Sequence, residues 1–199
     1  MAIAFNAKNF TVLNYAAVCA KLRAMQAGKQ TPTLHIHYER IKPYLYDKKA
    51  RDFIEHLFFP SAKNVAYYLT MWKRLQNLPI KEKRAMRMIL GTEIDLLNLN
   101  RMWRLKEYYG IVGDATYAYL IPIHHRLKPE VIAKYVACAT SAELITLASA
   151  GLYKAAVFSH EGMINTLRRQ YANAVRVYPQ SLTAVCGYLF EWGCRHKNI

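Results

Sequence analysis

The stretch from Ile80 to Tyr109 constrains the fold of this chain more than any other. It contains no proline and one internal glycine, Gly91, and it is followed by Gly110. Proline is disfavoured inside a helix because it lacks an N–H and clashes with the preceding turn, whereas glycine often follows the last helical residue. The stretch therefore predicts one uninterrupted helix, about 45 Å long at a rise of ~1.5 Å per residue.

The rest of the chain also reads as helices. Apolar residues recur at intervals of three and four over residues 11–27, 49–59, 62–77, 160–177 and 181–197. Alternation of strands with helices is not found along the sequence, and the fold class is therefore predicted to be all-α.

Local signals mark several helix boundaries. Pro129 suits the first position of a helix, where its missing N–H costs nothing, and Thr140 to Glu143 has the spacing of a capping box. Residues 31–49 are less regular, because Pro32 and Pro43 interrupt them and apolar residues alternate there as in a strand. We expect a loop or a broken helix in that segment.

Two polar side chains interrupt the apolar stripe of the long helix. At ~100° per residue, Asn98 and Arg101 fall on the same side as Ile94. The stripe also holds Leu97, Leu105, Tyr108 and Tyr109, while Leu96, Leu99 and Trp103 make the opposite side apolar as well. We therefore expect neighbouring elements to enclose this helix.

A buried amide or guanidinium needs partners, since leaving one unsatisfied costs about 1–3 kcal/mol or more. Glu93, Asp95 or carbonyl oxygens at a break in an adjoining helix are the expected partners. A catalytic carboxylate pair is the alternative interpretation of Glu93 and Asp95. Residues two apart on a helix point in nearly opposite directions, so we favour a structural polar network and expect no catalytic residue there.

The chain is strongly basic. Its 199 residues include 28 Lys and Arg against 13 Asp and Glu, for a net charge of +15, and 53% are apolar, as in a packed globule. The charge predicts attraction to nucleic acid, an anionic membrane or an acidic protein. A basic helical nucleic-acid-binding protein is thus an alternative function, carried by Lys81, Lys83, Arg84, Arg87, Arg168, Arg169 and Arg176. The sequence lacks the signatures of the common nucleic-acid-binding folds, which makes that alternative the weaker one.

Other candidate sites carry less weight. His35, His37 and Glu39 alternate in "HIHYE", and with His124 and His125 they suggest a metal site assembled from two stretches. Satisfied or solvated histidines are the favoured interpretation, and we expect no metal and no cofactor, since a glycine-rich phosphate loop is also lacking. Cys19, Cys138, Cys186 and Cys194 form no C-x-x-C pair, as expected of reduced thiols in a cytoplasmic protein.

Membrane association is expected to be peripheral. The N-terminal "MAIAFNAKNF" lacks the long apolar core of a signal peptide. The longest uncharged apolar run, from Leu144 to Tyr153, is about half of the ~20 residues that a bilayer-spanning helix needs.

Several motifs together resemble a known family. "EIDLLNLNRMWRLKEYYG" is followed by "YLIP", by "LKPEVIAKYVACATSAELITLASAGLY" and later by "YPQSLTAVCGYLF". In order and spacing, from about Met88 to Tyr153, they resemble the C subunits of bacterial and archaeal V/A-type ATPases, whose eukaryotic counterpart is the d subunit of the V-ATPase. The resemblance implies a three-fold repeated all-helical funnel, in which Glu93, Asp95, Asn98 and Arg104 belong to the packing network of one repeat.

The resemblance also implies a function. Proteins of this family catalyse nothing themselves; they lie on the cytoplasmic side between the rotor shaft and the membrane ring of proteolipid subunits, and they transmit torque between ATP turnover and proton or sodium transport. On that basis we expect a non-catalytic central-stalk subunit, peripheral on the cytoplasmic face of the membrane. Its expected partners are rotor-shaft subunits and the proteolipid ring.

The resemblance further suggests how the chain is organised. We expect a single helical domain over residues 1–199, in which 80–160 is the best-matching repeat and 160–199 begins a further one. Leu90, Asn98 and Leu99 align with Phe190, Asn198 and Ile199 at an offset of one hundred residues. Material of a full first repeat is lacking between Gly28 and Ile80, so we expect either a shortened relative or an incomplete chain.

Overall fold

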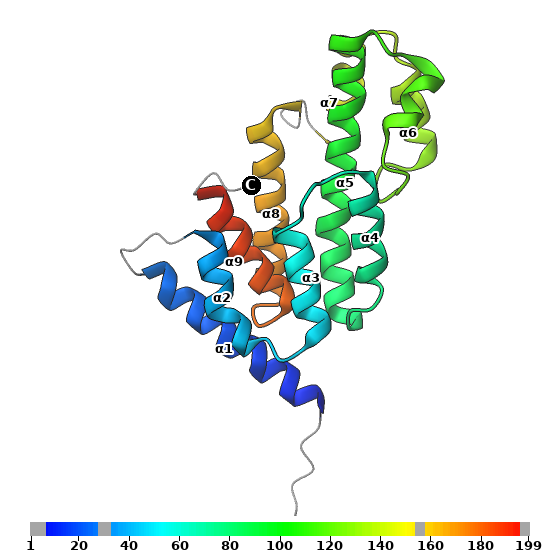
Figure 1. The fold of residues 1–199 in the computed structure, drawn as a ribbon. Helices are drawn as coiled ribbons and strands as arrows, with labels where there is room; N and C mark the ends of the chain where they lie inside the picture. The colour runs from blue at the N-terminus through cyan, green and yellow to red at the C-terminus, as the bar shows by residue number, and fades with distance from the viewer. Residues whose placement is uncertain (1–6, 28–32, 154–157, 196–199) are drawn as a thin grey trace, which may run out of the picture. The chain divides into compact units, whose positions relative to one another are not determined.

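The long helix predicted from the sequence is α5, Ile80–Tyr109, which is 30 residues long (Figure 1). The computed structural model describes residues 7–27, 33–153 and 158–195, without the side chains of residues 7–14, 26 and 27. Both ends of α5 agree with the prediction. Gly110 follows at φ 63°, a left-handed conformation that glycine adopts without steric cost.

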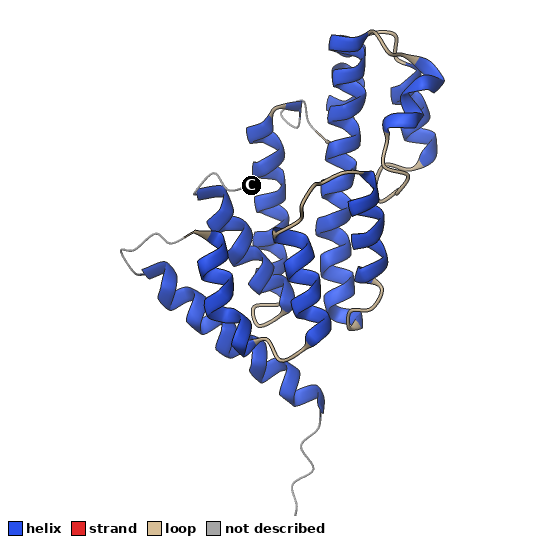
Figure 2. Ribbon diagram, in the orientation of Figure 1, coloured by secondary structure: helices blue, strands red, loops and turns tan. Residues whose placement is uncertain are grey.

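The all-α prediction is confirmed, since the described residues contain helices and short 3₁₀ segments but no strand (Figure 2). The elements besides α5 are α1 (Ala7–Ala27), α2 (Leu34–Ile41), η1 (Lys42–Tyr44), α3 (Lys48–Phe58), α4 (Val65–Leu75), η2 (Gly113–Tyr119), α6 (Pro129–Ala137), α7 (Ser141–Ser149), α8 (His160–Val177) and α9 (Leu182–Arg195). The helices predicted over 49–59, 62–77, 160–177 and 181–197 are therefore α3, α4, α8 and α9.

The chain forms two compact units. Unit 1 comprises Met1–Ala62, Lys73–Met86 and Arg168–Ile199. Its central element is α9, which contacts α1, α2 and α3. Apolar residues cover α9 on several sides, as is typical of a helix enclosed in a core; the fully buried ones include Leu182, Ala184, Val185 and Cys186.

Unit 2 comprises Lys63–Trp72 and Arg87–Leu167. Its core lies along α5, where Ile94, Leu96, Leu99 and Met102 have no exposed surface. Around them, η2 contacts α6, and α6 contacts α7. The middle of α5 is thus enclosed, as predicted from its two apolar sides.

Several local predictions can be compared with the structure. Pro129 is the first residue of α6, and the side chain of Thr140 accepts the Glu143 N–H at 3.1 Å, as a capping residue does. The broken-helix prediction for residues 31–49 is confirmed by α2 and η1. The strand-like alternation there is helical instead, because Leu34, Tyr38 and Ile41 are buried at helical spacing.

One prediction about the apolar stripe of α5 is wrong. Tyr108 and Tyr109 are exposed by 65% and 66%, although the helical wheel placed them with Ile94. A helical wheel gives the direction of each side chain. It does not show how far along α5 the neighbouring elements extend, and they end before its last turn.

The repeat and the single domain stay predictions. The proposed alignment of the two repeats depends on Asn198 and Ile199, which lie outside the described residues, as does Gly28.

In the described parts of the chain, no helix has the length and apolar character that crossing a membrane requires.

Candidate functional site

Within unit 2, Asn98 joins α5 to the backbone of the segment after η2. Its Nδ2 donates to the carbonyl oxygen of Ile121 at 3.0 Å, and its Oδ1 accepts the Ile121 N–H at 2.8 Å. Asn98 is only 1% exposed. The Ile121 carbonyl oxygen also accepts the Ile123 N–H at 2.8 Å, so the amide chiefly supplies the acceptor that the Ile121 N–H needs in this irregular segment, where Pro122 precludes a regular helix.

Asp95, one turn earlier on α5, holds the same segment further along. Its Oδ2 accepts the N–H groups of Arg126 and Leu127 at 2.9 and 3.2 Å and the hydroxyl of Tyr153 at 3.0 Å. Burial, together with the nearby Asp95 carboxylate, raises the pKa of Tyr153, so this hydroxyl remains a donor. Three donors converge on a carboxylate that is 1% exposed, which offsets the cost of burying its charge.

The other polar residues predicted on α5 differ in their surroundings. Arg101 donates from a terminal nitrogen to the carbonyl oxygen of Tyr119 at 3.0 Å. Glu93 accepts the hydroxyl of buried Tyr68 at 2.9 Å, and its Oε1 lies 3.6 Å from the Lys63 ammonium. Arg104 is exposed and makes no hydrogen bond or ion pair with another described residue.

The structure therefore brings Asn98, Asp95 and Arg101 to one backbone segment, residues 119–127, while Glu93 binds elsewhere. Of the two kinds of partner expected for Asn98 and Arg101, carbonyl oxygens are the ones observed. Glu93 and Asp95 take separate partners, so their carboxylates are not arranged around a shared substrate position. These contacts attach the 119–127 segment to α5.

Lys106 extends these contacts and was not singled out from the sequence. Its Nζ donates to the carbonyl oxygens of Val136 and Cys138 at 2.9 and 2.6 Å, at the end of α6. The last carbonyls of a helix lack intrahelical partners and carry its negative dipole, so they favour a cation. Burial lowers the pKa of Lys106.

His125 lies directly against α5 at Gly91. A Cβ on Gly91 would lie 2.7 Å from Cδ2 and 2.8 Å from Cβ of His125, closer than real side chains approach. The Nε2 of His125 is buried and has no hydrogen-bond partner among the described residues. Burial lowers the pKa of His125 against the opposing effect of Asp95, because removal from water disfavours the charged ring. Gly91 is thus required for close packing of the segment.

A hollow of about 380 Å³ opens beside these contacts in unit 2. It is lined by Asn64 and Val65 at the start of α4, by Arg101, Arg104, Leu105 and Tyr109 on α5, and by Ala118 and Tyr119 at the end of η2. We call it the α5 groove. Its four α5 residues share one face at helical spacing.

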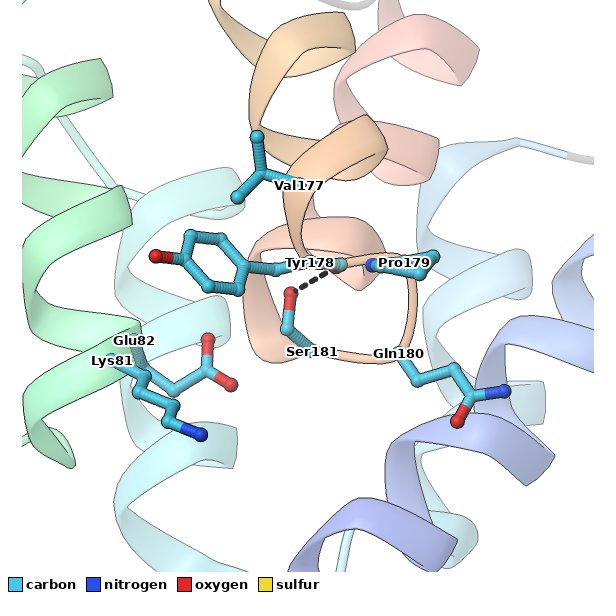
Figure 3. Close-up of a pocket in the computed structure, with 7 residues that line it drawn as sticks. All are labelled: Lys81, Glu82, Val177, Tyr178, Pro179, Gln180 and Ser181. Carbon is cyan, nitrogen blue, oxygen red and sulfur yellow. Dashed lines mark hydrogen bonds between the residues drawn. The ribbon is translucent and has the colours of Figure 1, made fainter.

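A second hollow, of about 270 Å³, lies in unit 1 between the start of α5 and the turn before α9. Figure 3 shows Lys81 and Glu82 across from Tyr178, Pro179 and Ser181. Glu82 Oε2 lies 3.4 Å from both the backbone nitrogen and the hydroxyl of Thr183, at the first turn of α9. Burial nevertheless raises the pKa of Glu82, because these long contacts only partly replace water.

The structure offers little support for the metal site or the nucleic-acid-binding surface considered from the sequence. His37 belongs to unit 1, where its ring lies 3.8 Å from that of Trp192, whereas His124 and His125 belong to unit 2. No group of three potential metal ligands exists in the parts of the chain that the structure describes. Among the basic residues, Arg168 pairs with Glu191 at 2.8 Å and Arg87 lies over the ring of Trp72.

The sequence pointed to Asp95, Asn98 and Arg101 but not to their partners, and Arg104, predicted in the same network, makes no hydrogen bond or ion pair with a described residue. The missed partners include Tyr68 and Tyr153, buried tyrosines that are easily assigned to the apolar core, and buried Lys106 on α5 itself was also missed. The available signal was that a buried acid such as Asp95 needs donors, which apolar segments supply through tyrosine hydroxyls and backbone N–H groups.

Comparison with known proteins agrees with the resemblance found in the sequence. Residues 62–191 match the model of the family described as ATP synthase (C/AC39) subunit. The match covers more than half of the chain and includes every α5 contact described above from Lys63 to Tyr153. Neither the curated proteins nor the solved structures contain a significant match. The chain belongs to the C/AC39 family of V/A-type ATPase subunits.

Proposed function

We propose that this protein is a non-catalytic central-stalk subunit of a V/A-type ATPase. In this role it links the rotor shaft to the proteolipid ring at the cytoplasmic face of the membrane, and it catalyses no step of proton or sodium transport itself. The family match over residues 62–191 is the observation that carries the proposal. The polar contacts of α5 support it by suggesting resistance to mechanical load.

The mechanical argument rests on how α5 is attached within unit 2. Its side chains bind neighbouring elements from Glu93 to Lys106, a distance of about 20 Å along the helix axis. Sliding the 119–127 segment along α5 would break the contacts of Asp95, Asn98 and Arg101 together, leaving buried donors and acceptors unpaired. Such a connection deforms less under shear than one made of apolar contacts alone.

A co-purification experiment tests the proposal. The tagged protein is purified from gently solubilised membranes of its source cells at moderate salt, with and without nuclease, and its partners are identified by mass spectrometry. We expect rotor-shaft and proteolipid subunits in both samples. Recovery of nucleic-acid-binding proteins alone, lost after nuclease treatment, would contradict the proposal.

A second experiment addresses coupling. Membrane vesicles depleted of the protein should hydrolyse ATP with less ion uptake per ATP than vesicles to which it is restored. The purified protein alone should not hydrolyse ATP. Unchanged coupling after depletion, or an enzymatic activity of the purified protein that is abolished by Asn98→Leu with Arg101→Met, would refute the non-catalytic linking role.

A further inference from the structure

The α5 groove contains positive charge that no carboxylate of the described residues neutralises. Arg101 is half-buried, and the described residues give it one hydrogen-bond acceptor, the carbonyl oxygen of Tyr119. Arg104 is exposed on the same face of α5, and no carboxylate among the described residues pairs with either guanidinium. A guanidinium has five N–H donors, so most of the donor capacity of this pair is unused within the described chain.

Of the two arginines, half-buried Arg101 gives the stronger evidence that the groove binds an anion. Removal from water lowers the pKa of Arg101, opposed only by the phenol of Tyr68. Partly desolvating a cation without an opposing charge costs free energy, which proteins usually recover through a carboxylate. The groove therefore has the electrostatics of a site whose anion comes from another molecule.

Apart from Asn64, the remaining residues that line the groove are apolar or aromatic. Val65, Leu105 and Ala118 line it, and Tyr109 and Tyr119 form its rim, exposed by 66% and 50%. Tyr108, Val112 and Tyr117, in the same stretch of chain, are exposed as well. Tyrosine and arginine are the residues that protein interfaces favour, because they combine contact area with directed hydrogen bonds.

We propose that the α5 groove binds an acidic segment of a partner protein, with a Glu or Asp carboxylate held between Arg101 and Arg104 and an adjacent apolar side chain against Tyr109 and Leu105. The proposal rests on the proposed function only in expecting that the segment belongs to another subunit of the ATPase. It identifies the α5 end of unit 2 as a partner contact.

The geometry favours a protein over a nucleic acid. Nucleic-acid backbones are held by several exposed cations that follow successive phosphates. In the groove, one of the two cations is half-buried and the surrounding walls are mostly apolar or aromatic. A planar guanidinium matches the two oxygens of one carboxylate, and a hollow of about 380 Å³ accommodates a few side chains.

A binding assay on the purified protein tests the groove without the ATPase. The probe is a short fluorescein-labelled peptide in which Glu and Leu alternate, and fluorescence anisotropy measures its affinity. A peptide with Gln in place of Glu is the matched probe. We expect the Glu peptide to bind, and the double variant Arg101→Gln with Arg104→Gln to bind it at least about tenfold more weakly, since charge-assisted hydrogen bonds are the strong ones.

The control variant removes the same charge elsewhere. Arg40→Gln with Arg84→Gln changes two exposed arginines outside the groove and should retain most of the affinity. Circular dichroism establishes that both variants are folded. Equal losses in the two variants would show attraction to net charge alone and overturn the proposal, as would binding of single-stranded RNA, but not of the peptide, through Arg101 and Arg104.

Photo-crosslinking identifies the partner in the assembled complex. Benzoylphenylalanine replaces Tyr109 at the groove or, as a control, exposed Tyr46 in unit 1. We expect the Tyr109 position to label an acidic segment of another ATPase subunit, and labelling to fall when Arg101 and Arg104 are changed to Gln. Assembly without such labelling would overturn the groove proposal and leave the central-stalk function standing. Peptide binding through the two arginines without any assembly would support the groove and refute the central-stalk function.

Discussion

Replacing Asn98 with leucine should destabilise unit 2 through one specific backbone group. The Ile121 N–H donates to Asn98 Oδ1 at 2.8 Å, and Ile121 is 1% exposed, so the substitution leaves this donor buried without its partner. The Ile121 carbonyl oxygen loses Asn98 Nδ2 but keeps the Ile123 N–H at 2.8 Å. The loss is therefore dominated by one buried donor rather than by two equivalent groups.

The magnitude follows from these two unequal losses. An orphaned buried donor costs about 1–3 kcal/mol, and the carbonyl bond contributes about 1 kcal/mol. Leucine has a similar size and greater apolar character, which offsets about 1 kcal/mol of the sum. We expect the free energy of unfolding to fall by about 2 kcal/mol.

Asn100→Leu provides a matched control two residues away. Asn100 is only partly buried and makes one long hydrogen bond, from Nδ2 to the carbonyl oxygen of Phe158 at 3.3 Å. Its replacement should cost less than about 0.5–1 kcal/mol. Urea denaturation followed by circular dichroism measures both losses, and amide hydrogen exchange reports the Ile121 N–H directly.

Two results would refute this reasoning. One is an equal loss of stability in the Asn98→Leu and Asn100→Leu variants. The other is an Ile121 amide that stays protected from exchange in Asn98→Leu, because that would mean that another acceptor replaces the side chain.

Three further predictions concern the packing and titration of buried groups. Gly91→Ala should lower the free energy of unfolding by about 1 kcal/mol, since overpacking against His125 exceeds the gain in helix propensity, and adding His125→Ala should restore part of the loss in a double-mutant cycle. Lys106→Met should cost about 1–3 kcal/mol in urea denaturation by leaving two carbonyl oxygens unpaired, whereas exposed Lys134→Met should cost little; similar losses would contradict the role of Lys106. Glu82→Gln should stabilise the protein at pH 7, because the pKa of Glu82 is raised in the folded state and the wild type loses stability as the pH rises through that pKa. The difference in stability between the variant and the wild type should vanish below about pH 4.5. A difference that stays constant between this pH and pH 7 would exclude titration of Glu82 as its cause.

The helices and the need for polar partners could be predicted from the amino-acid pattern alone. The proline-free stretch fixed α5 at Ile80 and Tyr109, and Gly110 ended it in a conformation that glycine favours. The period of 3.6 residues also placed Asn98 and Arg101 on a face expected to be enclosed, because that period is a local property of the backbone. Family motifs along α5 carried the resemblance that the match over residues 62–191 confirms.

The partners of the α5 side chains, in contrast, depend on how distant parts of the chain pack together. Asn98 meets Ile121 across 23 residues, and Asp95 meets Tyr153 across 58, so these pairs depend on how the intervening chain returns to the helix. Helical periodicity gives the direction of a side chain, whereas a hydrogen bond requires the position of the second group to within a few tenths of an ångström. The exposure of Tyr109 has the same origin as the lack, among the described residues, of a carboxylate beside Arg101 and Arg104: both depend on where the cover provided by neighbouring elements ends.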